Sequence, residues 1–160
     1  MLLGVLSDTH SHVEYTQDAV RIMRNLGVEM TLHCGDIGGV SIIPVFGDLS
    51  AHFVLGNVDW NEQEMREAIA DAGQTYHGRF GRLDVENRRI AFLHGDDEQL
   101  LRRTIAEDEV DVVCYGHTHV AEHHFENGKL VVNPGAVWRS RPPSVAVLDL
   151  AKMHATMVPI

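Results

Sequence analysis

The stretch LLGVLSDTH, residues 2–10, opens the chain with a short apolar run that stops at Ser7 and Asp8. An apolar run bounded by polar residues predicts a buried β-strand that ends in a loop. Residues 13–26 then carry apolar side chains at helical spacing, and Gly27 follows as a stop signal. A strand joined to a helix by a short loop is the repeating unit of a parallel sheet.

The same pattern recurs twice further along the chain. Residues 28–34 predict a second strand that points at Asp36, and residues 52–55 predict a third strand that points at Asn57. A helix follows the third strand, whereas residues 41–46 form a connection without a defined pattern. The alternation predicts a parallel sheet, in which ligands bind at the carboxyl ends of the strands.

The pattern changes after residue 73. Alternation around Asn87-Arg88 predicts a β-hairpin whose second strand runs into His94. The remaining predicted elements are hairpin strands at 76–86 and 89–93, a helix at 98–107, a strand at 111–115, and antiparallel segments at 121–125, 130–133 and 145–150. These elements predict an α/β fold of two packed sheets with outer helices. Without an internal repeat or linker, residues 1–160 are expected to form one domain.

The composition is typical of a globular protein, with 44% hydrophobic and 22% charged residues in a chain of 160. No apolar run approaches the roughly 20 residues that span a bilayer, so we expect no membrane association and a cytoplasmic location. Cys34 and Cys114 each lie in an apolar run, which favours buried free thiols over a disulfide or a zinc site.

The charge balance argues against extended nucleic-acid binding. The chain has 23 acidic and 13 basic side chains, a formal net charge of −10, and no sustained stripe of Lys or Arg. Such a surface repels polyanions. A small phosphate ester is the expected partner. A homo-oligomer is possible, because apolar residues 42–46 suit either a contact between copies or packing on the sheet.

Five predicted strand ends present polar groups of one chemical kind. Carboxylate, amide oxygen and imidazole, without a competing thiolate, suit first-row divalent ions such as manganese, iron, zinc or nickel. Each residue alone is typical of a turn or a helix cap, but together they predict a metal site. The groups are Asp8-Thr9-His10, Gly35-Asp36, Gly56-Asn57-Val58-Asp59, His94-Gly95 and Gly116-His117-Thr118-His119.

This ordered set of motifs resembles the calcineurin-like metallophosphoesterases, especially their small single-domain bacterial and archaeal phosphodiesterase branch. The resemblance extends from Asp8 to the Asn133-Pro134-Gly135 loop, and the joint pattern is very specific although each motif alone is weak. It implies the family's four-layer αββα sandwich, in which two mixed β-sheets are flanked by helices.

The resemblance also implies a centre with two divalent metal ions, with manganese expected and nickel, iron or zinc as alternatives. Asp36 would bridge the ions and would be catalytic together with Asn57 and His117. One ion would be held by Asp8, His10 and His119, and the other by Asn57, His94 and His117.

The implied function is hydrolysis of a small or nucleotide-like phosphodiester. Two ions about 3.5 to 4 Å apart deprotonate water near neutral pH and stabilise the oxygens of an in-line displacement at phosphorus. Val58 departs from the family pattern, because many members carry there a His that protonates the leaving oxygen. The proton donor therefore stays open. The alternatives are a phosphomonoesterase with the same metal core and a non-catalytic protein-binding scaffold of the same fold.

Several other residues near the motifs are candidates for supporting or substrate-binding roles. His12 is a candidate substrate contact or proton donor, with a solvated loop residue as the alternative. Arg139 and Arg141 are candidate contacts for a phosphate oxygen, with a solvent-exposed turn as the alternative. Asp59 is expected to hold a neighbouring loop or to orient a ligand. Trp138 and Trp60 suit either a substrate rim or packing against loops.

The remaining histidines are not expected to bind metal. His33 and His52 lie in apolar strands and are predicted to be hydrogen-bonded structural residues. His123 and His124 are expected to be peripheral, and His77 and His154 are expected to lie at the surface.

Overall fold

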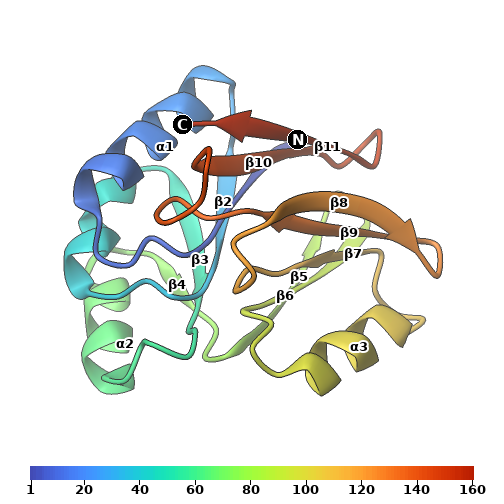
Figure 1. The fold of residues 1–160 in the computed structure, drawn as a ribbon, viewed down its shortest axis with the longest axis horizontal. Helices are drawn as coiled ribbons and strands as arrows, with labels where there is room; N and C mark the ends of the chain where they lie inside the picture. Colours follow the sequence, from blue (N-terminus) through green and yellow to red (C-terminus); the bar gives the residue numbers. More distant parts are fainter.

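Two mixed β-sheets form the centre of the computed structural model, which describes all 160 residues (Figure 1). The first sheet contains β1 (Leu2–Leu6), β2 (Met30–Cys34), β3 (Ser50–Val54), β4 (Thr75–Tyr76), β10 (Ser144–Asp149) and β11 (His154–Pro159). The second contains β5 (Phe80–Val85), β6 (Arg88–Leu93), β7 (Val112–Cys114), β8 (Ala121–Glu126) and β9 (Lys129–Pro134). Their orders are β11-β10-β1-β2-β3-β4 and β5-β6-β7-β9-β8.

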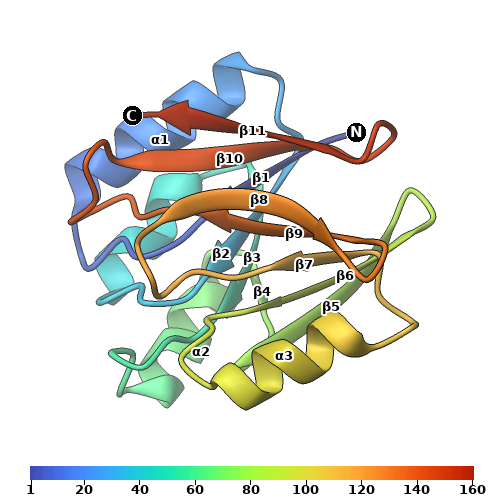
Figure 2. The ribbon, with the colours of Figure 1, turned by 45° about the vertical axis from the view of Figure 1, so that its right-hand side comes forward.

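Helices cover the outer faces of both sheets (Figure 2). The helices are α1 (Val13–Asn25), the 3-10 helix η1 (Val40–Phe46), α2 (Glu62–Asp71) and α3 (Glu98–Ala106). The first three pack on the first sheet and α3 packs on the second, which confirms the predicted αββα sandwich. None of these helices is both long enough and apolar enough to cross a membrane.

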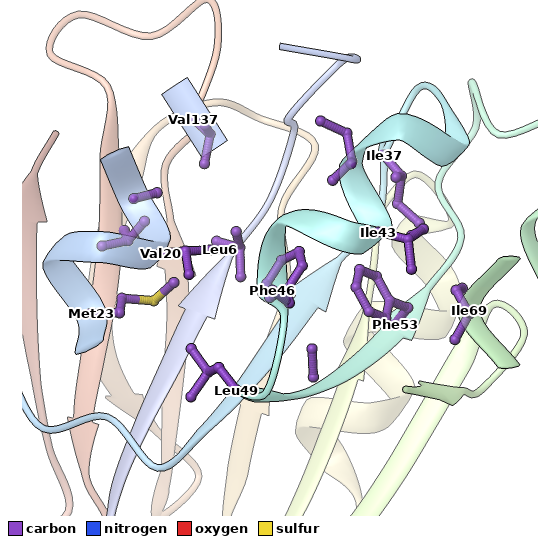
Figure 3. Packing of buried hydrophobic residues seen from close by; sticks show 14 of the residues in the cluster. Leu6, Val20, Met23, Ile37, Ile43, Phe46, Leu49, Phe53, Ile69 and Val137 are labelled. Atoms are coloured by element: carbon purple, nitrogen blue, oxygen red, sulfur yellow. The ribbon is translucent and has the colours of Figure 1, made fainter. Parts of the chain in front are cut away.

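Three apolar clusters fix the layers, and the smallest, of seven buried residues, lies between the second sheet and α3. Eighteen buried residues fill the space between the first sheet and its helices, where Phe46 of η1 meets Phe53 of β3 edge to face at 5.1 Å (Figure 3). Fifteen buried residues fill the space between the sheets. In β1, Leu3 and Val5 face the second sheet while Leu6 faces the helices. Burial on both faces explains why the strand is a continuous apolar run.

The two cysteines are free and buried in the layer between the sheets, as predicted. Burial raises the pKa of Cys114 to about 12 and that of Cys34 well above its usual value. Both groups are therefore protonated thiols at neutral pH, which are poor nucleophiles and poor metal ligands.

The predicted hairpin is present, but its limits differ from the prediction. The first hairpin strand begins at Phe80, because Thr75–Tyr76 pair in parallel with β3 in the other sheet. The two-residue turn is Glu86-Asn87, where both residues have positive φ, and not Asn87-Arg88. Positive φ at both central positions is the requirement of a type I′ turn.

The last third of the chain is less uniform than predicted. Strand β9 pairs antiparallel with β8 but parallel with β7. After β9 the chain returns to the first sheet, where β10 pairs antiparallel with β1. The edge strand β11 was not predicted, and the connection at residues 41–46 is the 3-10 helix η1.

His52 of β3 and His77 form a hydrogen-bonded pair, with Nδ1 of His52 2.9 Å from Nε2 of His77. The ring of His77 packs edge to face against Phe92 and is half-buried, so it is less exposed than the surface position predicted for it. Burial and the neighbouring His77 lower the pKa of His52 to about 4, and burial lowers that of His77. Both rings are therefore neutral at pH 7, and one donates its N–H to the other.

This pair is expected to make the protein less stable in mild acid. The pKa of His52 is about 4 when folded and about 6.5 when unfolded, so the unfolded chain binds more protons between these values. Stability is therefore lost as the pH falls from about 6.5 towards 4. At pH 5 the cost from His52 is at most about 2 kcal/mol. Urea unfolding at pH 7.5 and pH 5 should show a smaller loss in His52→Gln than in wild type; equal losses would contradict the assignment.

Candidate metal centre

The candidate ligands meet where strands of both sheets end. Asp8 and His10 follow β1, Asp36 follows β2 and Asn57 follows β3, whereas the remaining candidates follow β6 and β7 of the second sheet. Backbone hydrogen bonds join these loops: the Asp8 amide donates to the Gly35 carbonyl at 3.0 Å, and the Gly116 amide donates to the His94 carbonyl at 2.9 Å. The fold thus gathers residues that lie far apart in the sequence.

The backbone is strained at this place. Non-glycine residues with positive φ are uncommon, and each costs on the order of 1 kcal/mol. Such strain persists only where the surrounding structure determines it, and it is concentrated at functional sites. Of the seven candidate ligands, five have positive φ: Asp8 (58°), His10 (44°), Asp36 (52°), His117 (69°) and His119 (60°).

One group of possible ligand atoms consists of Asp8, His10 and His119, whose atoms lie within 4.8 Å of one another. Oδ1 of Asp8 is 3.0 Å from Nε2 of His119 and 3.6 Å from Nε2 of His10. Nε2 of His10 is buried and has no hydrogen-bond partner. A buried polar atom without a partner is costly unless a missing group satisfies it, and an ion held among these atoms would do so.

The second group consists of Asp8, Asp36 and His94, all of them buried. Nε2 of His94 is 3.2 Å from Oδ1 of Asp36 and 3.1 Å from Oδ1 of Asn57. Asp36 therefore lies between the groups, because its other oxygen is 3.8 Å from Nε2 of His10.

The orientation of His94 indicates a cation. Its Nδ1 is 2.8 Å from the carbonyl oxygen of Cys34, which can only accept, so Nδ1 carries the proton. A neutral ring then points the lone pair of Nε2 at the oxygens of Asp36 and Asn57, which also carry lone pairs. A metal ion or an added proton is needed between them. A backbone carbonyl that fixes the ring in this way is the usual partner of a metal-binding histidine.

The ionisation of the site residues also indicates a bound cation. Burial acts to raise the pKa of Asp8, but contacts with His10 and Ser7 outweigh it and lower the pKa. Burial likewise opposes ionisation of Asp36, whose pKa is lowered by His94 and by the amide of Val58. Burial acts to lower the pKa of His94, and Asp36 and Asp8 reverse this effect and raise it. Two ionised and buried carboxylates require a nearby positive charge.

The other predicted site residues lie further out. The exposed His117 has its ring 5.1 Å from that of His94, edge to face, and its amide donates to Oδ2 of Asp8 at 3.1 Å. The ring of His12 stacks on Trp138, and Arg139 lines a cavity beside it. Trp60 is 85% exposed and packs against little.

Two supporting residues were not singled out from the sequence as parts of the site. Asn133, fully buried, donates to the Gly116 carbonyl at 2.9 Å and to Oγ1 of Thr118 at 3.0 Å, which holds the loop after β7. His33 accepts from the Gly35 amide at Nδ1, so its Nε2–H donates to Thr9 at 3.0 Å. His33 was predicted to be structural, and its contact with the first metal-site loop emerges only from the fold.

Asp59 has the supporting role predicted for it. Its carboxylate is 2% exposed and accepts three backbone amides, from Ile37 at 3.1 Å, Gly38 at 2.8 Å and Gly56 at 2.8 Å. These bonds tie the loop after β2 to the loop after β3. Asp59 therefore fixes the position of the Asp36 backbone relative to Asn57.

Replacing Asp59 by alanine is expected to lower the free energy of unfolding by about 3 kcal/mol or more, because each buried amide left without an acceptor costs about 1 to 3 kcal/mol. Urea denaturation measures the change. Asp84→Ala, which removes an exposed carboxylate on β5, is the matched control and should stay within about 0.5 kcal/mol of wild type. Equal stability of the two variants would show that Asp59 does not hold the loops.

Comparison with known proteins agrees with this geometry. A phosphodiesterase of Methanocaldococcus jannaschii is 29% identical over 157 residues, which is 95% of each chain. A probable metallophosphoesterase of Bacillus subtilis is 28% identical and covers 96% of this chain and 86% of its own. A solved archaeal phosphodiesterase superposes over both whole chains with a TM-score of 0.93 and 26% identity.

A more distant structure shares the fold alone. Vacuolar Protein Sorting 29 of Cryptosporidium parvum superposes over 99% of this chain and 97% of its own with a TM-score of 0.62, at 16% identity. The sequence model of the calcineurin-like phosphoesterase superfamily domain matches residues 1–153. Together with the convergence of the strand-end motifs on one site, this match shows that the chain belongs to the calcineurin-like phosphoesterase superfamily.

Proposed function

We propose that the protein is a metal-dependent phosphodiesterase that hydrolyses a small or nucleotide-like phosphodiester. The observation that carries this proposal is the buried Nε2 of His10, which has no hydrogen-bond partner and faces the Asp8 and Asp36 carboxylates, with Nε2 of His94 on the other side of Asp36. Such an arrangement suits divalent cations. Similarity in sequence and in structure to archaeal phosphodiesterase supports a diester as the substrate.

The proposed ligands divide into two sets that share one carboxylate. Asp8, His10 and His119 would hold one ion, Asn57, His94 and His117 would hold the other, and Asp36 would bridge them. The position of the Asp36 oxygens supports bridging, because one faces His94 at 3.2 Å and the other faces His10 at 3.8 Å. A mixture of carboxylate, amide and imidazole ligands suits manganese, our first choice, and also nickel, iron or zinc.

Two divalent ions at this place would lower the pKa of a water molecule and stabilise the charge on phosphate oxygens. The residues of the chain prepare the site for this chemistry. The Cys34 carbonyl keeps the His94 ring in one tautomer, and Asp59 keeps the loop of Asp36 in place. Val58 has no proton to give to the leaving alcohol, so esters with good leaving groups should react best.

The test is hydrolysis of an aryl phosphodiester and the matching aryl phosphomonoester by metal-stripped protein resupplied with manganese, nickel or zinc. We expect metal-dependent turnover, faster with the diester. Faster turnover of the monoester would make the protein a phosphomonoesterase. Absence of turnover by folded, metal-loaded protein would favour the non-catalytic scaffold.

A further inference from the structure

A cavity rich in aromatic and arginine side chains lies beside the candidate metal centre. Its volume of about 530 Å³ is within the range of small-molecule sites, about 300 to 1,000 Å³. The residues that line it come from α1 and from the loop between β9 and β10: Tyr15, Trp138, Arg139, Ser140, Arg141 and Pro143. The reaction proposed above does not use this cavity.

The cavity lies next to the site of the proposed reaction. The backbone amide of Trp138 donates to the carbonyl of Asp8 at 3.1 Å, so the main chain that carries the indole is attached to the first metal-site loop. A second cavity, of about 370 Å³, is lined by Ser140 and Arg141 together with the candidate ligand His119. Arg141 therefore lines both cavities, and the second of them reaches a candidate metal ligand.

Three rings form a preorganised aromatic wall. The imidazole of His12 stacks on the indole of Trp138, with centroids 3.4 Å apart and planes at 21°. The phenol of Tyr15 meets the same indole at 5.2 Å, edge to face. The indole is thus held in place without a ligand, and planar bases stack on such side chains with little regard to base identity.

The charge of the cavity favours an anion. Neither Arg139 nor Arg141 forms an ion pair or a side-chain hydrogen bond, whereas Arg21, for example, pairs with Asp18 and Arg89 with Asp111. No acidic side chain lines either cavity. In a chain with a net charge of −10, two unpaired guanidinium groups beside a metal centre form a local anion site.

The backbone of Arg139 adds a further indication. Its φ is 70°, a conformation that glycine adopts without cost and arginine does not. An arginine that only filled this turn would be less suitable than glycine. The strain is therefore explained if the side chain has a task.

We propose that this cavity, the base subsite, binds the nucleoside unit of a nucleotide phosphodiester. The base would lie against Trp138 and Tyr15, and Arg139 and Arg141 would bind a phosphate other than the one that is cleaved. This inference rests on the proposed function, because it names the substrate class of the same site. It also makes His12 a positioning residue, which acts by supporting the indole.

Three chromogenic diesters test the subsite: methyl 4-nitrophenyl phosphate, the 4-nitrophenyl ester of thymidine 5′-phosphate, and that ester with an added 3′-phosphate. In wild type we expect KM to fall along this series. Trp138→Leu should raise KM for both nucleotide esters by about 5-fold or more and leave the methyl ester unchanged. Arg139→Gln and Arg141→Gln should abolish only the decrease in KM that the added 3′-phosphate causes, which is the 3′-phosphate gain.

Two further variants separate a functional role from a structural one. Arg103→Gln removes an exposed arginine on α3, far from the cavity, and should change none of the three KM values. Arg139→Gly relieves the positive φ, so its Tm should be unchanged or higher while the 3′-phosphate gain is lost. Loss of the gain only together with a lower Tm would overturn the role of Arg139.

A binding measurement keeps this proposal separate from catalysis. In Trp60→Phe protein, Trp138 is the only tryptophan, and its fluorescence can be titrated with thymidine 3′,5′-bisphosphate in the presence of a chelator. Saturable quenching that Arg139→Gln and Arg141→Gln weaken would support the subsite even if no ester is hydrolysed. Hydrolysis of all three esters with equal KM, or absence of quenching, would overturn the subsite and leave the phosphodiesterase proposal standing.

Discussion

Replacing Asp36 by asparagine is expected to lower kcat/KM for an aryl phosphodiester by more than about 100-fold, beyond the 10- to 100-fold that loss of an outer partner of a metal ligand typically causes. Asp36 is the carboxylate whose oxygens face both His94 and His10. Asparagine preserves the size of the side chain and an oxygen that can accept from the Val58 amide, but it removes the negative charge that both ions would share.

The measurement is steady-state hydrolysis at saturating manganese, together with circular dichroism to show that the variant is folded. Asp84→Asn, which changes an exposed carboxylate on β5, is the control and should retain full activity. If Asp36→Asn kept more than about a tenth of the wild-type activity with its metal content unchanged, the bridging role of Asp36 would be wrong.

Replacing Gly56 by alanine is expected to disrupt the site through steric overlap of the added methyl group with Asp36. A Cβ atom at this position would overlap Oδ1 and the backbone nitrogen of Asp36 and would lie 2.9 Å from its Cγ. The backbone on both sides is fixed, because the Gly56 amide donates to Asp59 at 2.8 Å and the chain pairs as β3 just before it. Overlap with a fixed backbone costs about 3 kcal/mol, and relief requires Asp36 to move.

We therefore expect Gly56→Ala to unfold at lower urea concentration and to lose metal-dependent activity. Gly39→Ala is a matched control in the neighbouring loop, where the backbone is extended and the added Cβ meets only the rotatable hydroxyl of Ser11 within 3.0 Å. Similar stability and activity of the two variants would show that close approach of Gly56 to Asp36 is not required.

Local patterns were sufficient to predict much of the fold. Strand β1 has the predicted limits, because the apolar run from Leu2 to Leu6 is buried on both faces and stops at polar residues. Strand β11 was missed, because its residues alternate only weakly and its pairing with β10 is visible only in three dimensions. Tyr76 was predicted to belong to the hairpin strand, because nothing local indicates that it pairs with Phe53.

In the site, too, local sequence motifs could be predicted and contacts between distant residues could not. Each strand-end motif could be recognised because its ligands directly follow their own strand, so the five segments could be found one by one. Residues that act through distant partners could not. Asn133 bonds to the loop after β7, and Tyr15 on α1 meets Trp138 from the other end of the chain. The sequence contains no spacing that predicts these contacts, since the fold alone creates them.

The number of metal ions held by one chain tests the central claim most directly. Protein stripped with a chelator would be dialysed against manganese, and its metal content measured by elemental analysis, with electron paramagnetic resonance to detect coupling between ions. The dinuclear centre predicts two manganese ions per chain with a spin-coupled spectrum, and loss of the coupling in Asp36→Asn. Folded wild-type protein that binds no manganese, or only a single uncoupled ion, would contradict it.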